Sequence, residues 1–151
     1  MVKELLIASG IMGVCLVIHV TGILFLGEEL VRHRQIIEAR IGFGYAAALL
    51  ISIFVGLMIL HMGEAAIWAA FYLRAGLFKD FETSIYFSLQ SYSTVGYGDV
   101  SLPEKWRLLG TVEGIAGVLL CGLSAAFLFA IVSALFRFRV NRWQQTHTTE
   151  Q

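Results

Sequence analysis

Residues 92–99 read Tyr-Ser-Thr-Val-Gly-Tyr-Gly-Asp, and this stretch stands between two long apolar segments. Glycine adopts positive φ angles at little cost, so alternating Gly with larger residues lets successive peptides aim their carbonyl oxygens to one side. Irregular backbone of this kind is tolerated at membrane depth only where protein surrounds it or where it borders a wet pathway. The pattern therefore predicts a row of oxygens from Thr94, Val95, Gly96, Tyr97 and Gly98.

The composition of the chain excludes most classes of soluble protein. Of its 151 residues, 58% are hydrophobic and 15% are charged, with a mean hydropathy of +0.76; soluble domains carry about 25% charged residues. Eleven basic residues balance eleven acidic ones, which gives no sign of a nucleic-acid surface. Cys15 and Cys121 lie in apolar runs, with neither a disulfide framework nor a Cys/His zinc pattern. The composition indicates one domain that lies in a lipid bilayer.

Three segments are long and apolar enough to cross a bilayer, which takes about 20 residues. They comprise residues 5–26, 43–73 and 108–136. The half-apolar segment 82–92, which Asp80 is placed to cap, is too short to span. We therefore expect an all-α membrane protein with three transmembrane helices, a re-entrant short helix and a loop. Segment 5–26 is read as a retained helix, because no small-residue cleavage site follows it.

The distribution of basic residues suggests an orientation in the cell membrane. Cytoplasmic segments tend to be rich in Arg and Lys. The connector 27–41 and the tail each contain three arginines: Arg32, Arg34, Arg40 and Arg137, Arg139, Arg142. Both segments are thus expected in the cytoplasm, with the N-terminus outside. Five basic residues fall on the opposite side, so this count alone barely decides the orientation.

The order of these elements around residues 92–99 resembles the potassium-channel pore family. The resemblance covers 43–136: an outer helix 43–73, a pore helix 82–92, a filter 94–98 and an inner helix 107–136. It implies passive conduction of K⁺, whose hydration shell the filter carbonyls replace. A single filter copy implies a homotetramer. Residues 1–42 then form an extra helix with a cytoplasmic connector, and 137–151 form a short cytoplasmic tail.

The same resemblance assigns roles near the filter. Gln90 is expected to donate to Asp99, and the Tyr86 hydroxyl is expected to reach the same carboxylate. Phe87 has no donor for the Tyr97 hydroxyl, so we expect a filter prone to inactivation, unless Phe87 only packs. On the inner helix, Gly117 matches the hinge of the family. The positions that would face the cavity are Val118, Cys121, Ala125 and Phe129.

Two of the remaining features concern the helices around the filter. A ring of Phe129 side chains would close the pore by dewetting, whereas the alternative is that Phe129 faces lipid. The first helix is expected to pack peripherally against the outer helix through Ser9, Gly10 and Gly13, and His19 to be a polar contact between helices.

Buried ionisable groups form the other candidate site. Glu113 is costly in a membrane and needs a partner. His61 and Glu64 share a helix face at a similar depth. These three residues are predicted to cluster behind the pore helix, with hydroxyl partners from Ser88, Ser91 or Thr111. The group is either a proton-sensitive control of the filter or a structural network.

Several functional alternatives stay open from the sequence. They are a non-selective cation channel and a non-conducting, pore-like subunit of a mixed assembly. An enzyme is not expected, because no nucleophile and base lie at a workable spacing. We expect no cofactor besides the transported K⁺, and no nucleic-acid partner. A separate regulatory subunit is compatible with the sequence.

Overall fold

The computed structural model describes residues 2–33 and 42–148, and the secondary structure in these ranges is entirely helical. Three helices are long and apolar enough to cross a membrane. In chain order the elements are α1 (Val2–Arg32), α3 (Phe43–Arg74), α4 (Phe81–Tyr92), the 3₁₀ turn η1 (Glu104–Trp106) and α5 (Arg107–Thr148). The predicted all-α fold with three spanning helices is confirmed. Arg34 and Arg40 lie outside the described residues.

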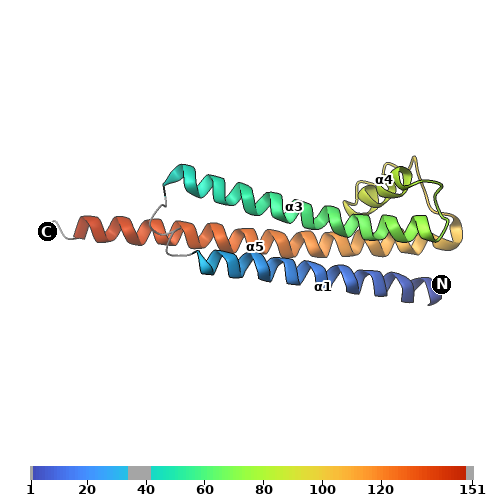
Figure 1. Ribbon diagram of the computed structural model, residues 1–151, viewed down its shortest axis with the longest axis horizontal. Coiled ribbons are helices and arrows are strands. Elements are labelled where there is room, and N and C mark those ends of the chain that lie inside the picture. Colours follow the sequence, from blue (N-terminus) through green and yellow to red (C-terminus); the bar gives the residue numbers. More distant parts are fainter. Residues whose placement is uncertain (1, 34–41, 149–151) are drawn as a thin grey trace.

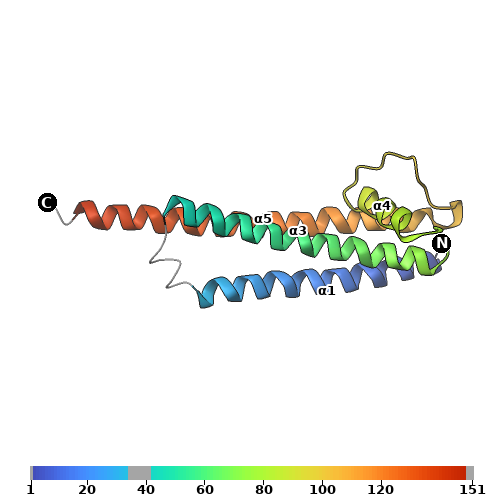
Figure 2. The ribbon, with the colours of Figure 1, turned by 45° about the horizontal axis from the view of Figure 1, so that its top comes forward.

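The three long helices run alongside one another, and α4 lies against one end of the bundle (Figure 1). Helix α4 contacts α3 and α5, while α1 packs on α5 and α3. A view turned by 45° shows the loop after α4 at the same end (Figure 2). The N-terminus lies at this end and the C-terminus at the other. Helix α5 continues through 137–148, the part assigned to the tail.

Helix α4 begins where the sequence supplies an N-cap. Asp80 has an extended backbone, and its carboxylate accepts a hydrogen bond of 2.7 Å from the Thr83 N–H. This bond satisfies one of the free N–H groups of the first turn. It also holds the pKa of the Asp80 carboxyl below its usual value.

Glycines on α5 let α4 approach closely. A Cβ atom added to Gly117 would lie 1.9 Å from the Tyr92 carbonyl oxygen, and one added to Gly114 would lie 3.1 Å from the Ser91 carbonyl oxygen. At Gly110 the nearest atom would be Phe87 Cζ, at 3.1 Å. The three positions follow helical spacing, so one stripe of α5 receives the C-terminal half of α4. Helix α5 is continuous through Gly117.

Helix α1 packs through different small residues from those expected. A Cβ atom on Gly10 or Gly13 would meet nothing within 4 Å. The close contact is further along, where a Cβ on Gly22 would lie 2.8 Å from Leu60 Cδ2. The expectation that Ser9, Gly10 and Gly13 form the contact is wrong, because α1 turns a different face inward, through the buried residues Ala8, Cys15 and His19.

Candidate functional site

The backbone after α4 has positive φ at every second residue. The φ angles are 59° at Thr94, 52° at Gly96 and 80° at Gly98. Thr94 is the unusual member of this series, because a residue with a branched Cβ rarely adopts positive φ. Such an angle costs about 1–3 kcal/mol and persists only where surrounding contacts impose it. The alternation gives the peptides of 94–98 a regular change of direction.

Hydrogen bonds to α4 hold three N–H groups of this loop. The Thr94 N–H donates to the Ser91 carbonyl at 3.0 Å, and the Gly96 N–H donates to the Gln90 carbonyl at 3.2 Å. The Tyr97 N–H donates to Gln90 Oε1, also at 3.0 Å. Within 2–33 and 42–148, no residue donates a hydrogen bond to a carbonyl of 94–98. Three of the five N–H groups of 94–98 are thus tied to α4, and the carbonyl oxygens are available to a ligand.

Asp99 anchors the far end of the loop to α4. Its carboxylate accepts hydrogen bonds from the Tyr86 hydroxyl at 2.8 Å and from Gln90 Nε2 at 3.0 Å. These bonds favour the ionised form and hold the pKa of Asp99 below its usual value. The Gln90 side chain therefore braces the loop twice, through Asp99 and through the Tyr97 N–H. The first of these contacts and that of Tyr86 match the sequence analysis, which did not foresee the second.

Phe87, one residue after Tyr86 on α4, lies in an aromatic cluster. Its ring centroid is 5.3 Å from that of Tyr72 and 5.2 Å from that of Phe78. The side chain is buried. Within its own chain, Phe87 thus packs α4 against α3 and makes no polar contact with the loop.

The loop itself is exposed in the single chain. The Tyr97 side chain is 75% exposed and that of Val95 is 52% exposed. A cavity of about 810 Å³ opens beside the loop, between α4 and the first half of α5. Its lining includes Thr94, Gly96, Gly114 and Val118. One chain therefore leaves both the loop and the adjoining surface of α5 uncovered.

The inner-helix positions assigned to a cavity share one exposed face of α5. Val118, Cys121, Ala125 and Phe129 are all exposed. Phe127 is only half-buried and faces α1, since its Cε2 would be 3.8 Å from a Cβ on Gly27. The two neighbouring phenylalanines, which the sequence leaves hard to tell apart, thus point to different surroundings.

The three predicted cluster residues divide into two buried groups. Glu113 accepts hydrogen bonds from the Tyr72 hydroxyl, at 2.7 Å, and from Ser88. Ser88 is one of the three hydroxyl partners that the sequence proposed. Thr111, another of them, bonds instead to the carbonyl of Arg107. Glu113 therefore joins α5 to α3 and α4, and it is not hydrogen-bonded to His61 or Glu64.

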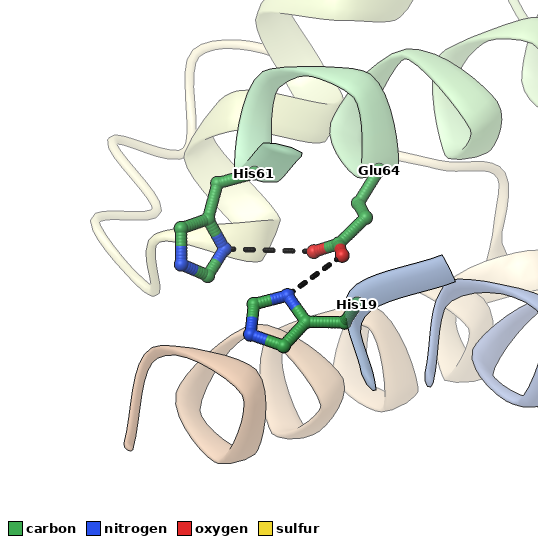
Figure 3. Close-up of side chains that lie close together, drawn as sticks. All are labelled: His19, His61 and Glu64. Atoms are coloured by element: carbon green, nitrogen blue, oxygen red, sulfur yellow. Dashed lines mark hydrogen bonds and ion pairs between the residues drawn. The ribbon is translucent and has the colours of Figure 1, made fainter. Parts of the chain in front are cut away.

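His61 and Glu64 belong to the second group, which also includes a side chain from α1. His19 Nδ1 is 2.8 Å from Glu64 Oε1 (Figure 3). His61 Nδ1 is 2.8 Å from the Tyr92 hydroxyl, which donates to Glu64 Oε2. Ser124 Oγ is 3.0 Å from His61 Nε2 and 3.1 Å from His19 Nε2. The group joins all three long helices and the end of α4.

His19 makes the polar contact between helices that the sequence predicted. Sequence reasoning nevertheless missed His19, Tyr92 and Ser124 as members of this group. Each comes from a different helix, and no short spacing connects them. The available signal was that His19 and Ser124 are polar residues within apolar segments, which usually face other protein rather than lipid. Their mutual distances depend on how the helices cross.

The sequence pattern of a protein family described as "Ion channel" matches residues 47–134, which is more than half of the chain. The match includes most of α3, all of α4, the loop 93–106 and α5 as far as Ala134. Helix α1 lies outside the matched range. No curated protein and no solved structure matches the chain.

Proposed function

Because the chain belongs to the ion channel family, we propose that it conducts K⁺ selectively and passively through a filter formed by residues 94–98. One observation carries this proposal: positive φ at Thr94, Gly96 and Gly98 together with N–H groups tied to α4. Backbone oxygens left free in this way can replace the water around a weakly hydrated cation. The intact Val95 and Tyr97 favour K⁺ over Na⁺, as the resemblance implies.

We propose that the conducting form is a homotetramer. A single row of carbonyls cannot surround an ion, and the chain contains one filter segment. The 75% exposure of Tyr97 and the open cavity of about 810 Å³ support the presence of neighbouring copies at this surface. Chemical cross-linking of the purified protein should give a ladder that ends at four chains. A ladder that ends at two would contradict the tetramer.

The proposed orientation puts the filter end of the bundle outside. The N-terminus shares this end and the C-terminus lies at the other (Figure 1). Arg137, Arg139 and Arg142 then lie on the cytoplasmic side, in agreement with the tendency of basic residues to stay inside.

The test is ion flux from liposomes that contain only the purified protein. We expect flux in a K⁺ gradient, little in a Na⁺ gradient, and block by barium. Gly96→Ala is the informative variant, because a Cβ atom at this position meets nothing within 4 Å. Only the φ of +52°, which alanine rarely adopts, disfavours the substitution. We expect Gly96→Ala to lose K⁺ flux. Gly122→Ala should keep it, because a Cβ at Gly122 also meets nothing within 4 Å and Gly122 has no positive φ. Equal K⁺ and Na⁺ flux would instead favour a non-selective cation channel.

A further inference from the structure

A buried set of three metal-ligating side chains lies where α1 meets α3. One ligand atom from each of His19, His61 and Glu64 lies within 4.8 Å of the others. His19 Nδ1 is 2.8 Å from Glu64 Oε1, and His61 Nδ1 is 3.5 Å from Glu64 Oε2. Figure 3 shows one histidine facing each oxygen of the carboxylate. The three groups therefore converge on a common space.

These distances suit ligands of a single cation. Nitrogen and oxygen ligands lie about 2.0–2.1 Å from zinc, so two ligands at angles of 90–120° are about 2.9–3.6 Å apart. The two nitrogen–oxygen distances, 2.8 and 3.5 Å, are close to this range. Small rotations of the two rings would bring the remaining ligand pair together. Imidazole and carboxylate are ligands that divalent d-block cations accept.

Ser124 orients both histidine rings for this role. Its hydroxyl oxygen is 3.0 Å from His61 Nε2 and 3.1 Å from His19 Nε2. One hydroxyl oxygen has two lone pairs and can accept an N–H from each ring. Both Nδ1 lone pairs then face the side where Glu64 lies. Metal-binding histidines are commonly held by such a second hydrogen bond.

The hydrogen bonds of the group also lack one hydrogen. Five contacts form a closed ring through Glu64, His19, Ser124, His61 and Tyr92. With Glu64 ionised and both histidines neutral, the two rings and two hydroxyls supply four hydrogens for these five contacts. No Lys or Arg occurs within 5–26, 43–73 or 108–136 to neutralise the carboxylate. A cation bound among these side chains would take the place of the missing hydrogen and balance the charge of Glu64.

We propose that His19, His61 and Glu64 bind one divalent transition-metal cation of the zinc class. Tyr92 Oη, which contacts both His61 and Glu64, is placed as a further oxygen ligand. The ion fastens α1 to α3 and to the last residue of α4, two positions before Thr94. Helix α1, which lies outside the family match, thereby acquires a structural role beside the filter.

The experiment measures zinc in the purified full chain. The protein in detergent is stripped with a chelator, dialysed against zinc and analysed by elemental mass spectrometry. We expect one zinc per chain in the wild type, and a loss of zinc in His19→Gln and Glu64→Gln. His33→Gln is the matched control, because His33 is exposed and pairs with Glu29; it should keep the full amount. Zinc should raise the melting temperature of the wild type and of His33→Gln. It should not raise that of His19→Gln or Glu64→Gln.

A further variant covers the case in which His19→Gln fails to fold. Ser124→Ala retains every ligand and removes only the group that orients the rings, so its zinc affinity should fall about 10–100-fold. A wild type without stoichiometric zinc would overturn the proposal. In that case a proton, rather than a metal ion, would supply the hydrogen missing from the ring of hydrogen bonds. Full zinc binding by Glu64→Gln would overturn it as well. Neither readout measures conduction, so either failure leaves the proposed channel function untouched.

Discussion

The contact between Gly117 and the end of α4 gives the sharpest prediction about packing. A Cβ atom at this position would lie 1.9 Å from the Tyr92 carbonyl oxygen and 2.8 Å from the Tyr92 carbonyl carbon. Both atoms belong to the backbone and cannot rotate away. Gly117→Ala must therefore push α4 from α5 by roughly 1.5 Å, since ordinary contacts of this kind lie near 3.4 Å or above.

We expect the substitution to destabilise the protein. Overpacking by one carbon costs about 1–3 kcal/mol, whereas a Gly→Ala change in an open part of a helix gains up to about 1 kcal/mol. For a chain of this size each kcal/mol shifts the melting temperature by about 2–4 °C. Gly122→Ala is the control, because its Cβ meets nothing within 4 Å on the same helix. Gly114→Ala, at 3.1 Å from a carbonyl oxygen, should fall between the two.

The assay is the melting temperature of the purified protein, followed by tryptophan fluorescence, with K⁺ flux measured on the same samples. Gly117→Ala should melt below Gly122→Ala by several degrees and lose flux, since Tyr92 precedes the filter. Equal melting temperatures for the two variants would refute the packing argument. If Gly117 were instead a hinge alone, Gly117→Ala would melt normally and only its opening would change.

Three other predictions follow from the contacts of single residues. Glu113→Ala should lower the melting temperature by more than Glu113→Gln does, because the alanine leaves the Tyr72 and Ser88 hydroxyls without a hydrogen-bond acceptor. Each unsatisfied buried group costs about 1–3 kcal/mol. Equal drops in melting temperature for the two variants would contradict this. Hydrogen bonds hold the pKa of Asp99 below its ordinary value. The ionised Asp99 carboxylate therefore stabilises the filter fully at any pH above the ordinary carboxyl pKa of about 4, and this stabilisation is lost as the pH falls through the lowered pKa. The K⁺/Na⁺ flux ratio should thus stay constant from pH 8 to pH 5 and fall only in stronger acid, and Asp99→Asn should abolish that acid step; a step near neutral pH would contradict the assignment. Phe129→Ala should raise the open probability without lowering the melting temperature, since this side chain is 73% exposed. Phe127→Ala, by contrast, should lower the melting temperature. An unchanged open probability in Phe129→Ala would argue against a gate at this residue.

The sequence predicts most of the fold because its signals are local. Apolar length alone locates the three long helices, and the Asp80 cap marks the start of α4 to within one residue. The positive φ angles of the loop follow from glycine at 96 and 98, although Thr94 adopts one without that help. Local patterns thus describe the elements and the loop.

The buried polar groups could not be assembled in the same way. The sequence joins Glu113 to His61 and Glu64, whereas the structure pairs it with Tyr72 and Ser88 and brings His19 to Glu64. Apolar membrane helices can rotate about their axes with little change in composition on either face, so the crossing of α1 and α3 decides these partners. Gly22 of α1 lies against Leu60 of α3 at this crossing, and the small residues 9, 10 and 13 do not predict that contact.

The central claim is that residues 94–98 select K⁺, and the reversal potential tests it most directly. The purified wild-type protein would be reconstituted in a planar bilayer with K⁺ on one side and an equal concentration of Na⁺ on the other. We predict a reversal potential displaced strongly toward the K⁺ equilibrium value, and the same displacement for Gly122→Ala. A reversal potential of zero in the wild type would contradict potassium selectivity.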